Sequence, residues 1–209
     1  MMCNLYSMTS AQSAIRALFD DLKDDTGNLA SLPGIYPDYP APVIHHTATG
    51  LTMSMMRWGM PSPQFALKGK KVDRGVTNVR NTKSPHWRRW LGPDNRCVVP
   101  FNAFSEFQKG RGPRWFALTP DKPLAFFAGI HTKWTSTRKV KEGEVTANLF
   151  GFLTTDPNAV VAPIHPKAMP VILTDPDQVQ QWLTAPVADA LTLQRPLPDD
   201  QLVLVDGPE

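Results

Sequence analysis

Cys3 lies close enough to the start of the chain to become its first residue after a short processing step. A cysteine at an amino terminus carries a thiol beside a free α-amine, and reference pKa values of about 8.5 and about 8 leave both groups partly nucleophilic at neutral pH. An aldehyde that meets this pair can form an imine with the amine, after which the thiol closes a thiazolidine ring. From its position alone, Cys3 can equally be a small apolar residue of the core.

Glu106 and His165 are suited to moving protons. Glu106 lies in the strand-like run NAFSEFQ, where alternation puts Phe104 and Glu106 on one face and predicts a carboxyl group that points inward. Such a carboxyl group has a raised pKa and exchanges protons near pH 7, whereas the alternative is a strand-edge glutamate that faces water. His165 lies in a proline-bounded loop, APIHPKAMPVIL, a setting typical of a proton donor and also of a loop cap.

Metal and nucleotide sites are not expected. The histidines show no HxxxH or HExxH spacing, and the two cysteines form no CxxC pair. The chain also lacks GxxxxGK[ST] and GxGxxG segments, so no nucleotide cofactor is predicted.

The segment from Lys68 to Trp90 is strongly basic. It holds eight cations against the single acid Asp73, and these are Lys68, Lys70, Lys71, Arg74, Arg80, Lys83, Arg88 and Arg89. Trp87 and Trp90 are interleaved with the cations and Trp58 lies nearby, which is the mixture that holds single-stranded nucleic acid: cations along the backbone and rings under the bases. The alternative is a solvated face backed by core tryptophans.

These residues must be positioned by a chain of 209 residues, a length that favours one domain, residues 1–209. Its 42% hydrophobic content, the absence of an apolar run of about 18 residues and the absence of a secretory leader predict a soluble cytoplasmic protein that does not enter a membrane. In that compartment Cys3 and Cys97 are expected to remain reduced.

Short β-prone runs separated by Gly, Pro or Asp dominate the chain after about residue 43. Thr9 and Gln12 read as a capping box for an amphipathic helix near residues 10–24, ending at Gly27. Two further helices are predicted, from Ser84 and Pro85 through Trp90 and from Asp175 and Pro176 through Leu183. The pattern predicts an α+β fold with a mostly antiparallel, barrel-like sheet and a few flanking helices.

Taken together, the motifs resemble the SOS-response-associated peptidase family, whose members shield abasic sites in single-stranded DNA by crosslinking to them. The resemblance spans roughly residues 2–183 and follows the family's order, with these matching segments: MCNLYS from Met2, RWGMP at Trp58, TNVRN at Asn78 and Arg80, RCVVPFNAFSEF from Arg96 to Phe107, AGIHTKW, and IHPKAMPVIL at His165. Leu5 stands where many members have a phosphate-binding arginine.

The resemblance implies a compact α+β domain and a covalent mechanism. Cys3, once terminal, would form a thiazolidine with the ring-opened sugar of an abasic site, after cysteine-type self-processing. Asn78 would orient the amine, Glu106 would shuttle protons, and His165 would help to open the sugar. The resemblance implies DNA contacts by Trp58 and Arg80, and the basic run adds Lys83, Trp87, Arg88 and Arg89. We expect a nucleoid-associated monomer whose partner is single-stranded DNA containing abasic sites.

The doubled methionine decides whether Cys3 can become terminal. Removal of an initiator methionine requires a small second residue, and Met2 is large. We therefore expect either that translation begins at Met2 or that the protein itself removes the two preceding residues. A reversible single-strand binder and a peptidase that acts on other proteins remain alternative functions.

Overall fold

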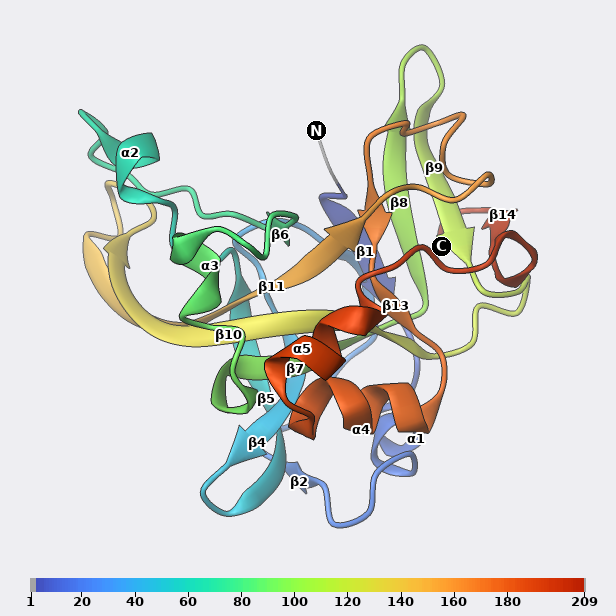
Figure 1. Cartoon of the computed structure of the whole chain (residues 1–209), viewed down its shortest axis with the longest axis horizontal. Helices are drawn as coiled ribbons and strands as arrows, with labels where there is room; N and C mark the ends of the chain where they lie inside the picture. Colours follow the sequence, from blue (N-terminus) through green and yellow to red (C-terminus); the bar gives the residue numbers. More distant parts are fainter. Residues whose placement is uncertain (1–2, 209) are drawn as a thin grey trace.

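Five strands of the larger sheet close into a barrel in the computed structural model, which describes residues 3–208 (Figure 1). Neighbouring strands run antiparallel in the order β11, β10, β7, β4, β5, and β5 then pairs in parallel with β11, which closes the ring. The bounds are β4 Pro40–Thr47, β5 Gly50–Trp58, β7 Arg96–Phe101, β10 Ala125–Thr137 and β11 Glu144–Thr155. The predicted α+β fold with a mostly antiparallel, barrel-like sheet is confirmed.

A second sheet of five strands lies beside the barrel, in the order β14, β9, β8, β1, β3. Its bounds are β1 Leu5–Met8, β3 Leu32–Ile35, β8 Ala103–Gln108, β9 Gly112–Ala117 and β14 Val203–Val205. β1 pairs with β8, so the segment that follows Cys3 is fixed against the strand that carries Glu106.

The core fills the barrel with aromatic side chains. Tyr6 enters from β1 and makes edge-to-face contacts with Trp58 and Phe127, at centroid distances of 5.1 and 5.6 Å. Phe101 stacks on Phe127 at 3.8 Å. These large buried rings are what a strand-rich chain with inward-facing aromatic residues is expected to bury.

Short strands and helices decorate the two sheets. The remaining strands are β2 Lys23–Asp24, β6 Asn78–Val79, β12 Met169–Pro170 and β13 Ile172–Leu173. The α-helices are α1 Gln12–Arg16, α2 Gln64–Leu67, α3 Pro85–Arg88, α4 Pro176–Thr184 and α5 Val187–Ala190. Single-turn 3₁₀ helices cover Pro93–Asn95, Leu191–Leu193 and Asp199–Gln201. None of the helices in residues 3–208 is long and apolar enough to cross a membrane.

The predicted helix near residues 10–24 is wrong in length and in its cap. α1 ends at Arg16, and its N-cap is Ala11, with no side-chain cap. The backbone N–H groups of Thr9 and Ser10 instead donate to the Asn102 side chain, so the capping geometry does not form. The Gln12 amide is drawn to the segment at Asp24 and Thr26, which occupies the space a longer helix would need.

The other two predicted helices are confirmed with their caps. The Ser84 hydroxyl accepts from the His86 N–H at the start of α3. The Asp175 carboxylate accepts from the Asp177 N–H at the start of α4, at 2.7 Å. The predicted strand at Val43–Thr47 lies within β4, whereas α2 and α5, each of four residues, were not predicted.

Candidate active site

Cys3 is buried beside β1, with only 1% of its surface exposed. Its sulfur lies 3.6 Å from the Leu5 carbonyl oxygen, which accepts from the thiol. Burial raises the pKa of the thiol, and the nearby Glu106 charge raises it further. The raised pKa keeps the sulfur a protonated thiol, and Met1 and Met2, whose removal is predicted, lie outside the described residues.

Glu106 points inward from β8, as the alternation predicted. It is 3% exposed whereas Phe107 is 65% exposed, so the interior face is the one shared with Phe104. The backbone N–H of Cys3 hydrogen-bonds to the carboxyl group, while atom Oε1 has no partner in the described part of the chain. Burial raises the pKa of Glu106 to about 8, so this group holds or releases a proton near neutral pH.

Asn78 holds the other side of the Cys3 backbone. Its Nδ2 atom donates to the Cys3 carbonyl oxygen at 2.8 Å and to the Thr77 hydroxyl at 2.7 Å. The strand β6 that carries Asn78 pairs with β11 because Gly151 leaves room: a Cβ there would meet the Val76 and Thr77 carbonyl oxygens at 3.2 Å. The Cys3 backbone is therefore hydrogen-bonded on both sides, with its carbonyl oxygen accepting from Asn78 and its N–H donating to Glu106.

His165 lies in the loop before β12 and is 8% exposed. Its Nδ1 atom lies 2.9 Å from the Ala168 carbonyl oxygen, which can only accept, so Nδ1 carries the proton and Nε2 is the basic nitrogen. Among residues 3–208, the bond to the Ala168 carbonyl is the hydrogen bond that this side chain makes, and it makes none to Cys3, Asn78 or Glu106. The structure thus brings three of the four predicted catalytic residues into contact and leaves His165 on a neighbouring loop.

The predicted DNA contacts divide into exposed cations and buried rings. Lys83, Arg88 and Arg89 are exposed, and Arg80 is partly exposed, in agreement with a cationic surface. The Arg89 guanidinium also lies over the Trp90 ring, at 5.0 Å from its centroid.

Trp58 and Trp87, which were predicted to contact DNA, are buried core residues in this structure. Trp58 is fully buried against Tyr6 and Phe152, and its indole N–H donates to the Thr77 carbonyl. Trp87 is 7% exposed and packs against His86 and Trp90. In this structure both rings pack inward, Trp58 in the barrel and Trp87 at α3, and neither is exposed enough to stack on a base.

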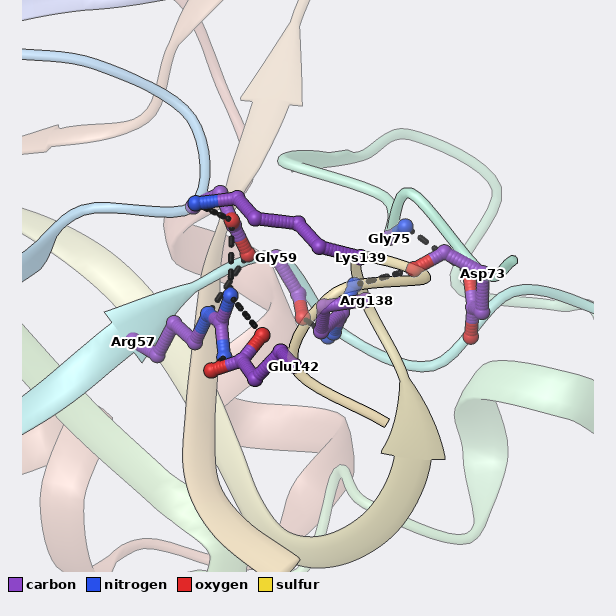
Figure 2. Close-up of polar contacts among 8 residues, drawn as sticks. Arg57, Gly59, Asp73, Gly75, Arg138, Lys139 and Glu142 are labelled. Atoms are coloured by element: carbon purple, nitrogen blue, oxygen red, sulfur yellow. Dashed lines mark hydrogen bonds and ion pairs between the residues drawn. The ribbon is translucent and has the colours of Figure 1, made fainter. Parts of the chain in front are cut away.

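A surface hollow of about 580 Å³ lies in the basic segment, lined by Ser62, Ala66, Leu67, Lys70, Lys71, Val72, Arg74 and Gly75. Burial alone would raise the pKa of Asp73, but hydrogen bonds from Ser62 and the Gly75 N–H lower it, so this carboxylate stays charged and pins the loop. The Arg138 guanidinium donates to the carbonyl oxygens of Asp73 and Gly59 and so fastens the same loop to the end of β10 (Figure 2).

The neighbouring charges in Figure 2 hold the end of β5 to the turn after β10. Arg57 donates to both oxygens of Asp38, at 2.5 and 2.7 Å, and to both oxygens of Glu142, at 2.8 and 2.9 Å. Lys139 adds an ion pair with Asp38 at 3.0 Å. These charge-assisted contacts tie the end of β5, the segment at Asp38 and the turn after β10 together.

Two residues of this region were missed by the sequence reasoning. Arg138 is 4% exposed and donates to the Asp73 carbonyl in the basic segment, and Asp156 forms an ion pair with Arg80. The directly following Pro157 and the turn-like TTDPN run were available as a signal for a residue at a strand end. Within residues 3–208, no group of three or more His, Cys, Asp or Glu side chains is arranged to hold a metal ion.

Comparisons with known proteins identify the fold and the family of this chain. Three solved structures share the fold, and each match covers 97% of this chain. A protein from Bacteroides thetaiotaomicron has a TM-score of 0.73 and 21% identity, with 90% of its own chain covered, and a protein from Bordetella bronchiseptica has a TM-score of 0.73 and 22% identity, with 98% covered. A phage-related protein from Bordetella bronchiseptica has a TM-score of 0.69 and 19% identity, with 92% of its chain covered. No curated protein matches the chain. The profile described as SOS response associated peptidase (SRAP) matches residues 2–206, and the chain therefore belongs to the SRAP family.

Proposed function

We propose that this protein removes the residues before Cys3 and then forms a covalent crosslink with abasic sites in single-stranded DNA. The observation that supports this most directly is the grip on the Cys3 backbone: Asn78 donates to its carbonyl and Glu106 accepts from its N–H. The nitrogen beside Glu106 is the atom that leaves in the first reaction and attacks in the second. The family's description, which names the SOS response and a peptidase, fits both reactions.

Self-processing hydrolyses the peptide bond between Met2 and Cys3. Water adds across the bond, so Met2 gains a carboxyl group and the Cys3 nitrogen becomes an amine. The leaving nitrogen needs a proton, and Glu106, whose pKa is raised to about 8 by burial, carries one at neutral pH and touches that nitrogen through the Cys3 N–H. Glu106 is the general acid of this step.

Crosslinking then uses the amine and thiol of Cys3. The amine adds to the aldehyde of the ring-opened sugar, and loss of one water gives an imine. The sulfur adds to the imine carbon and the nitrogen takes up a proton, which closes the thiazolidine with no oxidant or reductant. Asn78 keeps the Cys3 carbonyl fixed during both additions, and Glu106 returns the protons. The basic Nε2 of His165 is the group assigned to opening the sugar ring.

Single-stranded DNA would reach the site across the exposed cations. Arg80 lies two residues after Asn78, and Lys83, Arg88 and Arg89 follow it on the surface. These charges supply the sequence-independent attraction to phosphates on which such binding depends.

The test uses protein released with Cys3 as its first residue and an oligonucleotide with one abasic site. We expect a heat-stable adduct whose mass is the sum of the two components less one water. Cys97→Ala, which removes the other buried thiol, is the matched control and should form the adduct. Cys3→Ala keeps the terminal amine, so it should give only an imine that borohydride traps.

Two results would contradict the proposal. Equal adduct from Cys3→Ala without borohydride would show that the thiol is not used. Salt-sensitive binding to intact and abasic strands alike, with no adduct from the processed protein, would show a reversible single-strand binder instead. Self-processing is tested separately, because Glu106→Gln in the full chain should retain Met2 in the intact mass whereas the wild type loses it.

A further inference from the structure

Arg80 and Asp156 meet because two parallel strands end together. β6 pairs with β11 at Asn78 with Phe152 and at Val79 with Leu153, so the residues that follow both strands emerge at the same edge. The Arg80 Nη2 atom donates to the Asp156 Oδ1 atom at 2.5 Å, across 76 positions of sequence. The contact therefore depends on the register between β6 and β11, because the two residues are far apart in the sequence.

The contact lies in the open. Asp156 is 79% exposed in its side chain and Arg80 is 38% exposed. A hollow of about 220 Å³ adjoins the pair and is lined by Arg80, Asn81, Thr82, Lys83, Thr155, Asp156 and Gln194. Within residues 3–208, Arg80 is the recorded ion-pair partner of Asp156. A carboxylate and a phosphate compete for the same face of a guanidinium, because both present two oxygens to its N–H groups.

The Arg80 backbone is held independently of this pair. The Gln194 Nε2 atom donates to the Arg80 carbonyl at 2.9 Å and to the Thr154 carbonyl at 3.0 Å. The guanidinium also donates to the Lys167 carbonyl at 3.4 Å, in the loop that carries His165. Loss of Asp156 would therefore remove the carboxylate partner of Nη2, while the Lys167 carbonyl and Gln194 still hold Arg80 in place.

We infer that Asp156 is a built-in competitor of the DNA phosphate at Arg80. This inference rests on the proposed function, since it assigns a specificity role at the same site. In the free protein Asp156 neutralises the guanidinium, and a phosphate of single-stranded DNA must displace it before Arg80 can bind. Undamaged strands are held weakly for this reason, and the strand that is retained is the one joined covalently to Cys3.

The salt dependence of DNA binding tests whether a phosphate replaces Asp156 at Arg80. A cation that gains a phosphate contact releases counterions and adds about 0.7 to the slope of log K against log salt for a single strand. If Arg80 stays paired with Asp156 in the wild type, it makes no phosphate contact with an undamaged strand and adds nothing to this slope. Asp156→Asn restores the full release.

The experiment measures reversible binding of a fluorescent oligonucleotide without an abasic site at several salt concentrations. Asp156→Asn is expected to bind roughly twofold to fivefold more tightly than the wild type at low salt, the range for an exposed ion pair, with a slope steeper by about 0.7. Asp121→Asn is the matched control, because Asp121 is an exposed acid on the turn between β9 and β10. In an Arg80→Gln background, Asp156→Asn should have no more effect than Asp121→Asn.

The outcomes distinguish failure of the Asp156 inference from failure of the proposed crosslinking. If Asp156→Asn behaves like Asp121→Asn, or binds more weakly than the wild type, the inference is wrong. If Asp156→Asn shows the expected change but no Cys3-dependent adduct forms with an abasic strand, the proposed crosslinking is wrong and the competition stands. If none of the proteins binds the undamaged strand even at low salt, the inference is wrong, and the adduct assay with an abasic strand alone decides the proposed crosslinking. Unchanged melting temperatures for the variants would confirm that binding, and not folding, has been altered.

Discussion

Glu106→Gln should remove a pH dependence from the folding of the unprocessed chain. The comparison is made in a Cys3→Ala background, which retains the backbone N–H at position 3 and removes the titrating thiol beside Glu106, and the intact mass is used to verify that both proteins keep the preceding residues. Glutamine has nearly the same shape as glutamic acid, and its carbonyl oxygen can still accept the N–H of residue 3. The substitution therefore changes one property of the site, which is the proton held by the carboxyl group.

The size of the effect follows from the shift in pKa. Burial raises the pKa of Glu106 from 4.5 to about 8, and this difference corresponds to about 5 kcal/mol. Between these values the native state holds a proton that the unfolded state has lost, so the free energy of unfolding falls as pH rises. The contribution is fully present below about pH 4.5 and is lost by about pH 8.

Urea unfolding from pH 4.5 to 9 measures the difference between the two proteins, in which all other titrating groups cancel. The free energy of unfolding of the glutamine variant, minus that of the glutamate protein, should rise by several kcal/mol across this range. Glu144→Gln, at the exposed start of β11, is the control and should follow the parent curve. A difference that stays within about 1 kcal/mol from pH 4.5 to 9 would refute the assignment of a buried, protonated carboxyl group.

Two further predictions concern stability. Gly75 has a φ of +76°, and a Cβ there would overlap the Arg138 guanidinium, so Gly75→Ala should lower the free energy of unfolding by roughly 3 kcal/mol. The control is Gly143→Ala, which should lower it by about 1 kcal/mol, because Gly143 has a φ of +72° but open space around it. Equal losses in thermal or urea unfolding would contradict the role of Arg138. The Tyr6 hydroxyl is fully buried with no hydrogen-bond partner among residues 3–208, so Tyr6→Phe should leave stability unchanged or raise it by about 1 kcal/mol in urea unfolding, and a clear loss would show that the hydroxyl is satisfied.

Local signals in the sequence predicted the features that depend on nearest neighbours. Ser84 and Asp175 cap helices because each side chain reaches an N–H group two residues ahead, a contact that needs no distant partner. The inward direction of Glu106 followed from the alternation of a strand, which the pairing of β8 with β1 and β9 preserves.

Features that depend on contacts between distant segments could not be predicted from local sequence patterns. Asn102 takes the N–H groups of Thr9 and Ser10 from more than 90 positions away and removes the predicted cap. Trp58 and Trp87 lie among cations in the sequence, yet strand and helix geometry turn both rings into the core. No composition rule distinguishes a stacking ring from a packing ring, because the difference lies in which face the fold covers.

The concealment of the Cys3 sulfur has a chemical consequence of its own. Peroxides attack thiolates at accessible positions, and a sulfur that is 1% exposed, with a pKa raised by burial, offers them neither charge nor access. This folded chain is therefore expected to keep the Cys3 sulfur reduced in the presence of peroxide. Under the proposed function, the fold would thus protect from oxidation the same sulfur that closes the thiazolidine.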